Sequence, residues 1–397
     1  MNLRIAIVGA CPYPVPQGSQ VFLRDTALAL HDRGHDVHLV VYGYGEGVDE
    51  SGLRIHRSAH VVRERRIQSG PSLGKPLLDL ALVAKLRRVV REERIQIVQA
   101  HNYEGLLVAL AAGVRPIVYQ AHNAMADELP HYAGFRVAGT RLGSLLDRGL
   151  PKRAAHAVVP HAALAQYLVA CGCKPAKVSV IAPPASVRWF DPLPAEGRCP
   201  PILYTGNLDA YQNVEFLRHV IARVRTEIHE ARLLLATRDR IPIEYADFLH
   251  TPDFAALRAV LNQDAVAVCP RVSWSGYPIK LLNAMAAGKA IVACRSAAHP
   301  LDHERTGLIV NDNDESAFAS AVVRLMRDPA LRDRLGKAAR MQVVHQHSPA
   351  VFAEKLEHVF DRAILRAYPG TGRTDKFVGM ARRAGTRPGP PPPAPEP

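Results

Sequence analysis

The sequence lacks a continuous apolar run of about 18 residues, the length that a membrane-spanning helix needs. The best candidate, PLLDLALVAKLRR, is interrupted by Asp79 and Lys85. The apolar stretch within MNLRIAIVGACPYP is short and ends at Cys11 and Pro12, which is typical of a first strand and not of a signal peptide. We therefore expect a cytoplasmic protein without a membrane span.

Cysteine is scarce, and its positions do not have the spacing of zinc ligands. This argues against a cysteine metal site and fits reduced thiols in a cytoplasmic protein. His299 and His303 are spaced like two ligands on one helix, but no third ligand accompanies them, so we expect no metal. The six cysteines are Cys11, Cys171, Cys173, Cys199, Cys269 and Cys294.

The sequence also lacks the three-glycine fingerprint of dinucleotide-binding domains, which argues against a dehydrogenase. Its first strand leads instead into CPYPVPQGSQVFLRDTALALHDRGHDVHLVVY. Gly18 lets the backbone approach a ligand, Ser19 can cap the following helix, and Gly34 is placed to end that helix. A strand, a glycine turn and a helix N-terminus together form a site for phosphate or sugar oxygens. The structural alternative is that Gly18 serves only the turn.

Positive charge predominates, because 50 Lys and Arg residues against 37 Asp and Glu give a formal net charge of +13. This charge favours anionic partners, namely nucleotide diphosphates, anionic lipid or nucleic acid, and its sign alone does not choose among them. No nucleic-acid-binding motif accompanies it, so we expect no nucleic acid partner. Basic clusters at 61–75, 84–94 and 140–153 suggest one basic side of the first domain, suited to an anionic membrane surface or to a phosphorylated acceptor.

Apolar, β-branched runs alternate with longer helical patterns, which predicts an α/β protein with parallel sheets covered on both faces. Two sets of runs predict two doubly wound domains, at 1–184 and 201–348, joined by a Pro-rich linker at 185–200. A helix at 349–368 is expected to pack back on the first domain, and the Pro-rich tail at 369–397 is expected to be disordered. The predicted strands lie in LRIAIVGA, DVHLVVY, IQIVQA, PIVYQA, AHAVVP, PILYTG, ARLLLAT, AVAVCP, AIVACR and GLIVND.

A second segment that runs from loop to helix, SGYPIKLLNAMAAGK at residues 275–289, presents polar groups to a ligand. Pro278 suits the first helical turn, so the free amides there face whatever lies before Gly276 and Tyr277. Lys280 and Asn283 are three residues apart and share one helix face, while Ile279, Leu282 and Met285 lie on faces that pack inward.

The chain resembles the retaining glycosyltransferases of the two-domain GT-B fold, in particular family four. The resemblance covers nearly everything from residue 3 to residue 365. It implies two Rossmann-like domains that face each other across a cleft, with a nucleotide sugar held mainly by the second domain. The motifs that carry it, in this order and spacing, are PQGSQVFLRDTALALHDRGHDVHLV, VQAHNYEG, YQAHNAMADEL, VSVIAPP, YTGNLDAYQN, SGYPIKLLNAMAAGKAIV and HERTGLIVNDNDESAFASAVVRLMRDPALRDRLGKAAR.

The resemblance places Gly18 and Ser19 near the donor diphosphate and sugar, and His122 beside the donor sugar as the catalytic-site histidine. Ser275 and Asn283 fall on the two glutamates of the family's paired-glutamate motif, of which the first meets the sugar and the second the ribose. Asn283 keeps hydrogen-bonding groups for ribose hydroxyls, whereas Ser275 is short and leaves room for another sugar or water. The structural alternatives are a core histidine for His122 and capping or solvation for Asn283.

The loop YTGNLDAYQN departs from the family, because Asn207 and Gln212 stand where many members have basic residues that neutralise the diphosphate. An amide supplies no charge, and charge-assisted hydrogen bonds are roughly twice as strong as neutral ones. The diphosphate must therefore find cations elsewhere, and Lys280, Arg271 and Arg238 are the candidates in that order.

We therefore expect a metal-independent retaining glycosyltransferase that moves a sugar from a nucleotide sugar to a hydroxyl acceptor in surface polysaccharide or glycolipid synthesis. Many similar transferases use lipid-linked acceptors, which would place the enzyme peripherally on the inner face of the membrane. No cofactor is expected. One alternative is a nucleotide-sugar-binding or scaffolding protein with a degraded catalytic site. A sugar-nucleotide epimerase is a weaker alternative, since no acid and base pair is evident.

Overall fold

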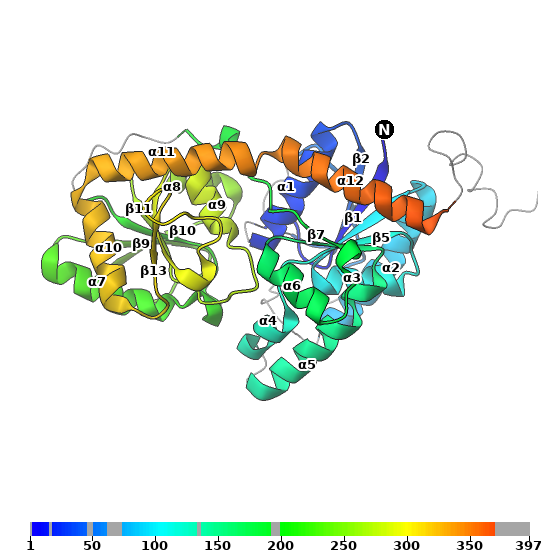
Figure 1. Ribbon diagram of the computed structural model, residues 1–397, viewed down its shortest axis with the longest axis horizontal. Helices are drawn as coiled ribbons and strands as arrows, with labels where there is room; N and C mark the ends of the chain where they lie inside the picture. Colours follow the sequence, from blue (N-terminus) through cyan, green and yellow to red (C-terminus); the bar gives the residue numbers. More distant parts are fainter. Residues whose placement is uncertain are drawn as a thin grey trace, which may run out of the picture.

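The computed structural model describes residues 2–15, 18–45, 51–61, 74–132, 136–191 and 199–369. These residues form two parallel sheets with helices on both faces (Figure 1). The strands are β1 (Arg4–Gly9), β2 (Asp36–Val41), β3 (Arg54–Arg57), β4 (Ile97–His101), β5 (Ile117–Gln120), β6 (His156–Val159), β7 (Val178–Val180), β8 (Ile202–Thr205), β9 (Leu233–Thr237), β10 (Ala246–His250), β11 (Val266–Cys269), β12 (Ala290–Cys294) and β13 (Leu308–Val310). Their orders are β3-β2-β1-β4-β5-β6-β7 in the first sheet and β10-β9-β8-β11-β12-β13 in the second.

Most of the helices occupy segments between these strands, as expected for parallel neighbours that need crossover connections, and the last three follow β13. They are α1 (Gly18–Asp32), α2 (Lys75–Glu92), α3 (Asn102–Ala111), α4 (Met125–Tyr132), α5 (Arg136–Gly149), α6 (Ala162–Ala170), α7 (Val214–Glu227), α8 (Phe254–Asn262), α9 (Ile279–Ala286), α10 (Glu315–Arg327), α11 (Pro329–Gln346) and α12 (Pro349–Ala367). No helix among the described residues is long and apolar enough to cross a bilayer.

Alternate residues of the first sheet enter two different cores, because successive side chains of a strand point to opposite faces. In β2, Val37, Leu39 and Val41 share a core with α1 and α12. Val40, on the other face, shares a core with α2, α3 and α6. The core that holds α1 and α12 continues through α8 and α9 to the second sheet, so the two domains are joined by apolar contact.

The last helix belongs to the first domain although its sequence follows the second. α11 runs along the second domain, and α12 then packs against α1 (Figure 1). Glu357 on α12 accepts hydrogen bonds from Arg33 Nε (2.9 Å) and Nη2 (2.8 Å). Hydrogen bonds from Arg33 and from His35 to the Glu357 carboxylate lower the pKa of Glu357 to about 2.

The chain passes between the domains at two places that lie together. His347, at the end of α11, donates from Nδ1 to the carbonyl oxygen of Pro183 (2.9 Å). Its own carbonyl oxygen accepts from the backbone N–H of Ala185 (2.9 Å). The start of the linker and the end of α11 are therefore held side by side.

The predicted fold class is confirmed, since both doubly wound parallel sheets are present. Gly34 ends α1 as predicted, with a φ of 87°. Two local predictions were wrong, because Ser19 lies within the first turn of α1 and is not its cap, and Pro278, which was predicted in the first helical turn, is the N-cap of α9. The edge strands β3, β7 and β10 lie outside the apolar runs that were predicted as strands. Most of the 61–75 cluster and of the tail lies outside the described residues.

Candidate functional site

A cavity of about 260 Å³ lies between the domains, lined by residues that follow β1, β4 and β5 in one sheet and β8, β9 and β11 in the other. The carboxyl ends of parallel strands are where open α/β sheets bind ligands. Arg238, a candidate cation, also lines this cavity. Ten of the predicted site residues line it: Gly18, Ser19, His122, Asn207, Gln212, Gly276, Tyr277, Pro278, Lys280 and Asn283.

Helix α9 presents Lys280 and Asn283 to the cavity from one face, as their spacing predicted. Lys280 Nζ is buried and has no hydrogen-bond partner among the described residues. It lies 4.2 Å from the centroid of the Tyr204 ring. Burial lowers the pKa of Lys280 to about 8. The site therefore holds a cation that a bound anion would stabilise.

Arg271 is a further cation of the cavity wall, and Gly276 makes room for it. A Cβ on Gly276 would lie 2.0 Å from Arg271 Nη2. This nitrogen donates to Ser273 Oγ (3.1 Å), and the guanidinium lies over the Tyr211 ring. Arg271 Nε has no hydrogen-bond partner within the described part of the chain. A side chain at Gly276 would thus displace the guanidinium.

The amides of Asn207 and Gln212 are engaged with each other. Gln212 Nε2 donates to Asn207 Oδ1 (2.8 Å), and Asn207 Nδ2 donates to Asp209. Gln212 Oε1 is buried and has no hydrogen-bond partner in the described ranges. Both side chains line the cavity, where a phosphate oxygen would compete with Asp209 for the Asn207 donor.

His122 and His101 form a buried pair at the ends of neighbouring strands. A hydrogen bond joins His101 Nδ1 and His122 Nε2 (3.1 Å), and Phe22 packs against both rings. Burial lowers the pKa of His122 to about 4, and burial with the nearby His122 also lowers the pKa of His101. Both imidazoles are neutral at pH 7, so His122 can exchange hydrogen bonds with a sugar hydroxyl but adds no charge.

Glu128 also lines the cavity, although sequence reasoning did not single it out. It lies on α4 and accepts hydrogen bonds from Tyr132 Oη (3.2 Å) and Asn123. Burial and the neighbouring Glu104 raise the pKa of Glu128 to about 7, against the opposing effect of Arg271. The only sequence signal was a carboxylate shortly after the strand-end histidine in AHNAMADEL.

Ser275 contacts the other domain and not the cavity. Asp127 Oδ2 on α4 accepts from Ser275 Oγ (2.6 Å), from the Ser275 backbone N–H (3.1 Å) and from Ser273 Oγ (2.8 Å). His161 Nε2, also in the first domain, donates to the Ser275 carbonyl oxygen (2.9 Å). Ser275 therefore lies outside the cavity wall, whereas the sequence prediction placed it at the donor sugar.

Gly18 lines the cavity, whereas His299 and His303 have local roles. A Cβ on Gly18 would meet Ile279 Cβ at 3.8 Å, an ordinary contact, so packing alone does not require glycine there. The His299 ring stacks on His161 at 4.6 Å, and His303 Nδ1 accepts from the backbone N–H of Ile309 (2.9 Å). Among the described residues, neither histidine belongs to a cluster of three metal-ligand side chains.

Comparison with known proteins gives family matches for both domains. The profile of Glycosyltransferase Family 4 matches residues 16–188, and that of Glycosyl transferases group 1 matches residues 199–328. D-inositol 3-phosphate glycosyltransferase from Corynebacterium diphtheriae is 25% identical over 422 residues, covering 92% of this chain and 96% of the relative.

Solved structures show the same architecture. Sucrose-phosphate synthase from Thermosynechococcus elongatus has a TM-score of 0.76 at 17% identity, covering 92% of this chain and 100% of that chain. Anabaena HepE in complex with UDP and glucose has a TM-score of 0.69 at 15% identity, covering 91% and 100%. At these identities the likeness shows the fold. With the family matches, it shows that the chain belongs to the glycosyltransferases of the GT-B fold and is similar to family four.

Proposed function

We propose that this glycosyltransferase is retaining and metal-independent, and that it binds a nucleotide diphosphate sugar in the cavity between its domains. The observation that carries the proposal is the buried Lys280 Nζ, which faces the cavity without a hydrogen-bond partner among the described residues. A buried ammonium is costly unless an anion pairs with it. The donor diphosphate is the anion that a glycosyltransferase of this fold brings to such a place.

The donor would be held by several groups of the second domain. Lys280, Arg271 and the free amides at the start of α9 face the diphosphate, because helix N-termini and cations favour phosphate. Asn283 would bond the ribose hydroxyls as donor and acceptor. From the first domain, Gly18 and Ser19 approach the diphosphate and sugar at the start of α1.

Transfer needs no enzyme nucleophile in this proposal. The bond from the anomeric carbon to the diphosphate oxygen breaks, and the acceptor oxygen attacks from the same face. The acceptor proton passes to the departing diphosphate, whose growing charge Lys280 and Arg271 stabilise. His122 orients a sugar hydroxyl as a neutral hydrogen-bonding group, and Glu128, protonated in part near pH 7, can donate to another.

We propose that the acceptor is phosphorylated or lipid-linked, in surface polysaccharide or glycolipid synthesis. The name of the Corynebacterium relative, an inositol 3-phosphate glycosyltransferase, supports a phosphorylated polyol. On α5, Val137, Leu142 and Leu145 are more than half exposed, and Arg141 and Arg148 are exposed beside them. Such an apolar and basic face suits a cytoplasmic enzyme that rests on an anionic membrane.

Nucleotide release from a panel of donor sugars tests the reaction, and calorimetry with nucleoside diphosphates tests the site. Asn283→Ala should weaken nucleotide binding by about 1 kcal/mol, about fivefold. Asn283→Glu should retain binding, because that residue type serves the same hydroxyls in the family. If the folded wild type binds no nucleotide at about 1 mM, the transferase proposal fails and the scaffolding alternative takes its place.

A further inference from the structure

Three side chains with metal-ligand chemistry occupy positions of the first domain that its layer packing gives to apolar residues. His38 lies two residues before Val40 in β2, on the face that α2 covers. His56 in β3 is paired in register with Val40. Glu93 follows α2 and continues the spacing of its buried stripe, four residues after the buried Val89. The packing between α2 and the sheet is therefore apolar along most of the helix and polar at its C-terminal end.

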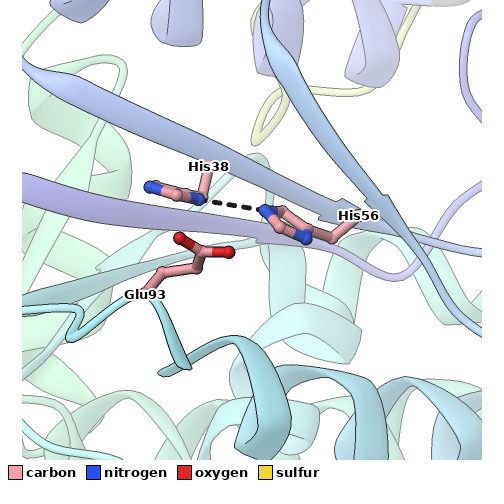
Figure 2. A group of neighbouring side chains, drawn as sticks. All are labelled: His38, His56 and Glu93. Carbon is pink, nitrogen blue, oxygen red and sulfur yellow. Dashed lines mark hydrogen bonds between the residues drawn. The ribbon is translucent and has the colours of Figure 1, made fainter. Parts of the chain in front are cut away.

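The three side chains meet at one point, as Figure 2 shows. A hydrogen bond joins His38 Nδ1 and His56 Nε2 (2.9 Å), and the Glu93 carboxylate faces this pair of rings. One ligand atom from each residue lies within 4.8 Å of the other two, and no other such group of three occurs in the described ranges. None of the three lines the donor cavity.

The carboxylate of Asp36 lies next to the second ring nitrogen of His38. His38 is fully buried, and its Nε2 makes no hydrogen bond among the described residues. This nitrogen lies 3.3 Å from Asp36 Oδ1, which is also 3.3 Å from Arg54 Nη1. Metal-binding histidines commonly direct their second ring nitrogen to a carboxylate, which fixes the ring orientation.

We propose that His38, His56 and Glu93 bind a zinc ion, with Asp36 orienting His38. Two histidines and one glutamate, completed by water, form a ligand set that zinc accepts in proteins. Tetrahedral bonds of about 2.0–2.1 Å separate two ligand nitrogens by about 3.3 Å, so the rings must move apart by a few tenths of an ångström. The ion would join the edge strand β3 and β2 to the end of α2.

The test uses the full chain, stripped with EDTA and desalted, with zinc chloride as the probe. Bound zinc per chain is measured by equilibrium dialysis, and the thermal midpoint is measured with and without zinc. The variants are His56→Gln and Glu93→Gln, both at half-buried positions. The matched control is His229→Gln, an exposed histidine of the second domain. Calorimetry with a nucleoside diphosphate reports whether each variant is folded.

We expect the wild type and the His229→Gln control each to bind one more zinc ion per chain than either variant binds. Zinc should raise the thermal midpoint of the wild type and the control but not of the two variants. Magnesium chloride should give no shift, because imidazole is a poor ligand for magnesium. Asp36→Asn should keep the stoichiometry and weaken the zinc affinity about tenfold or more. Equal zinc binding and equal thermal shifts in all these chains would overturn the proposal.

Discussion

Nucleotide binding should weaken as the pH rises through about 8, where Lys280 loses its proton in the free protein. Burial of the ammonium is the main cause of this low pKa, and the nearby Arg271 adds to it. A bound diphosphate places negative charge beside Nζ and returns the pKa of Lys280 toward its ordinary range. A Lys280 that is neutral before binding must then take up a proton from solvent when the nucleotide binds. The affinity is therefore full below pH 8 and falls as the pH rises above it.

The size of the effect follows from the pKa. With a value of about 8 in the free protein, about nine in ten Lys280 side chains are protonated at pH 7 and about one in ten at pH 9. The dissociation constant should therefore rise about tenfold over this interval, which is about 1.4 kcal/mol. Proton uptake per bound nucleotide should rise from about 0.1 to about 0.9.

Calorimetry with a nucleoside diphosphate in buffers of different ionisation enthalpy measures both quantities. Lys280→Met should remove the step near pH 8. Lys289→Met is the matched control, because burial also lowers the pKa of Lys289 to about 8 but its Nζ donates to Gln263 outside the cavity. Titration of Glu128 should give a separate change of nucleotide affinity near pH 7, which Glu128→Gln should remove. A constant affinity from pH 7 to 9 in the wild type would refute the assignment of Lys280 to the diphosphate.

Three other predictions concern the domain contact, metal and membrane. Ser275→Glu should lower the free energy of unfolding by about 3 kcal/mol, because it buries a second carboxylate against Asp127. Adding Asp127→Asn to this variant should restore part of the lost stability, as measured by chemical denaturation. A denaturation midpoint that Ser275→Glu leaves unchanged would contradict the prediction. Turnover should survive EDTA, because the phosphates find protein cations; a loss restored by magnesium or manganese would count against it. Leu145→Glu should reduce co-sedimentation with anionic vesicles, whereas the control Leu365→Glu, at an exposed leucine of α12, should not. Equal losses, or equal binding to neutral vesicles, would remove the membrane proposal.

Local patterns were enough to predict most of the fold. Strands such as β1 and β12 are buried throughout, so they appear as continuous apolar runs between helices. β3 has the sequence RIHR, with Arg54 and Arg57 exposed at the sheet edge. Such a strand carries no apolar run, and only its pairing with β2 makes it visible. β10 is also a partly exposed edge strand, so its sequence likewise lacks a continuous apolar run.

The site was predictable where one element sets the geometry and not where two elements meet. Helical spacing placed Lys280 and Asn283 on one face of α9. The contact of Asp127 with Ser275 joins residues 148 apart, and nothing local to either indicates it. The same holds for His38, whose partners come from a neighbouring strand and the end of a helix. Packing of separate elements decides these contacts.

The return of α12 makes the first domain discontinuous in the sequence. Phe352, Leu356 and Phe360 on α12 are buried in its core, so a fragment cut at the linker would expose one face of the sheet. The two chain crossings also meet at His347, which bonds the linker backbone at Ala185. Because these two covalent connections lie so close together, any relative rotation of the domains would pivot about that point and would have to break the apolar contact made through α8 and α9.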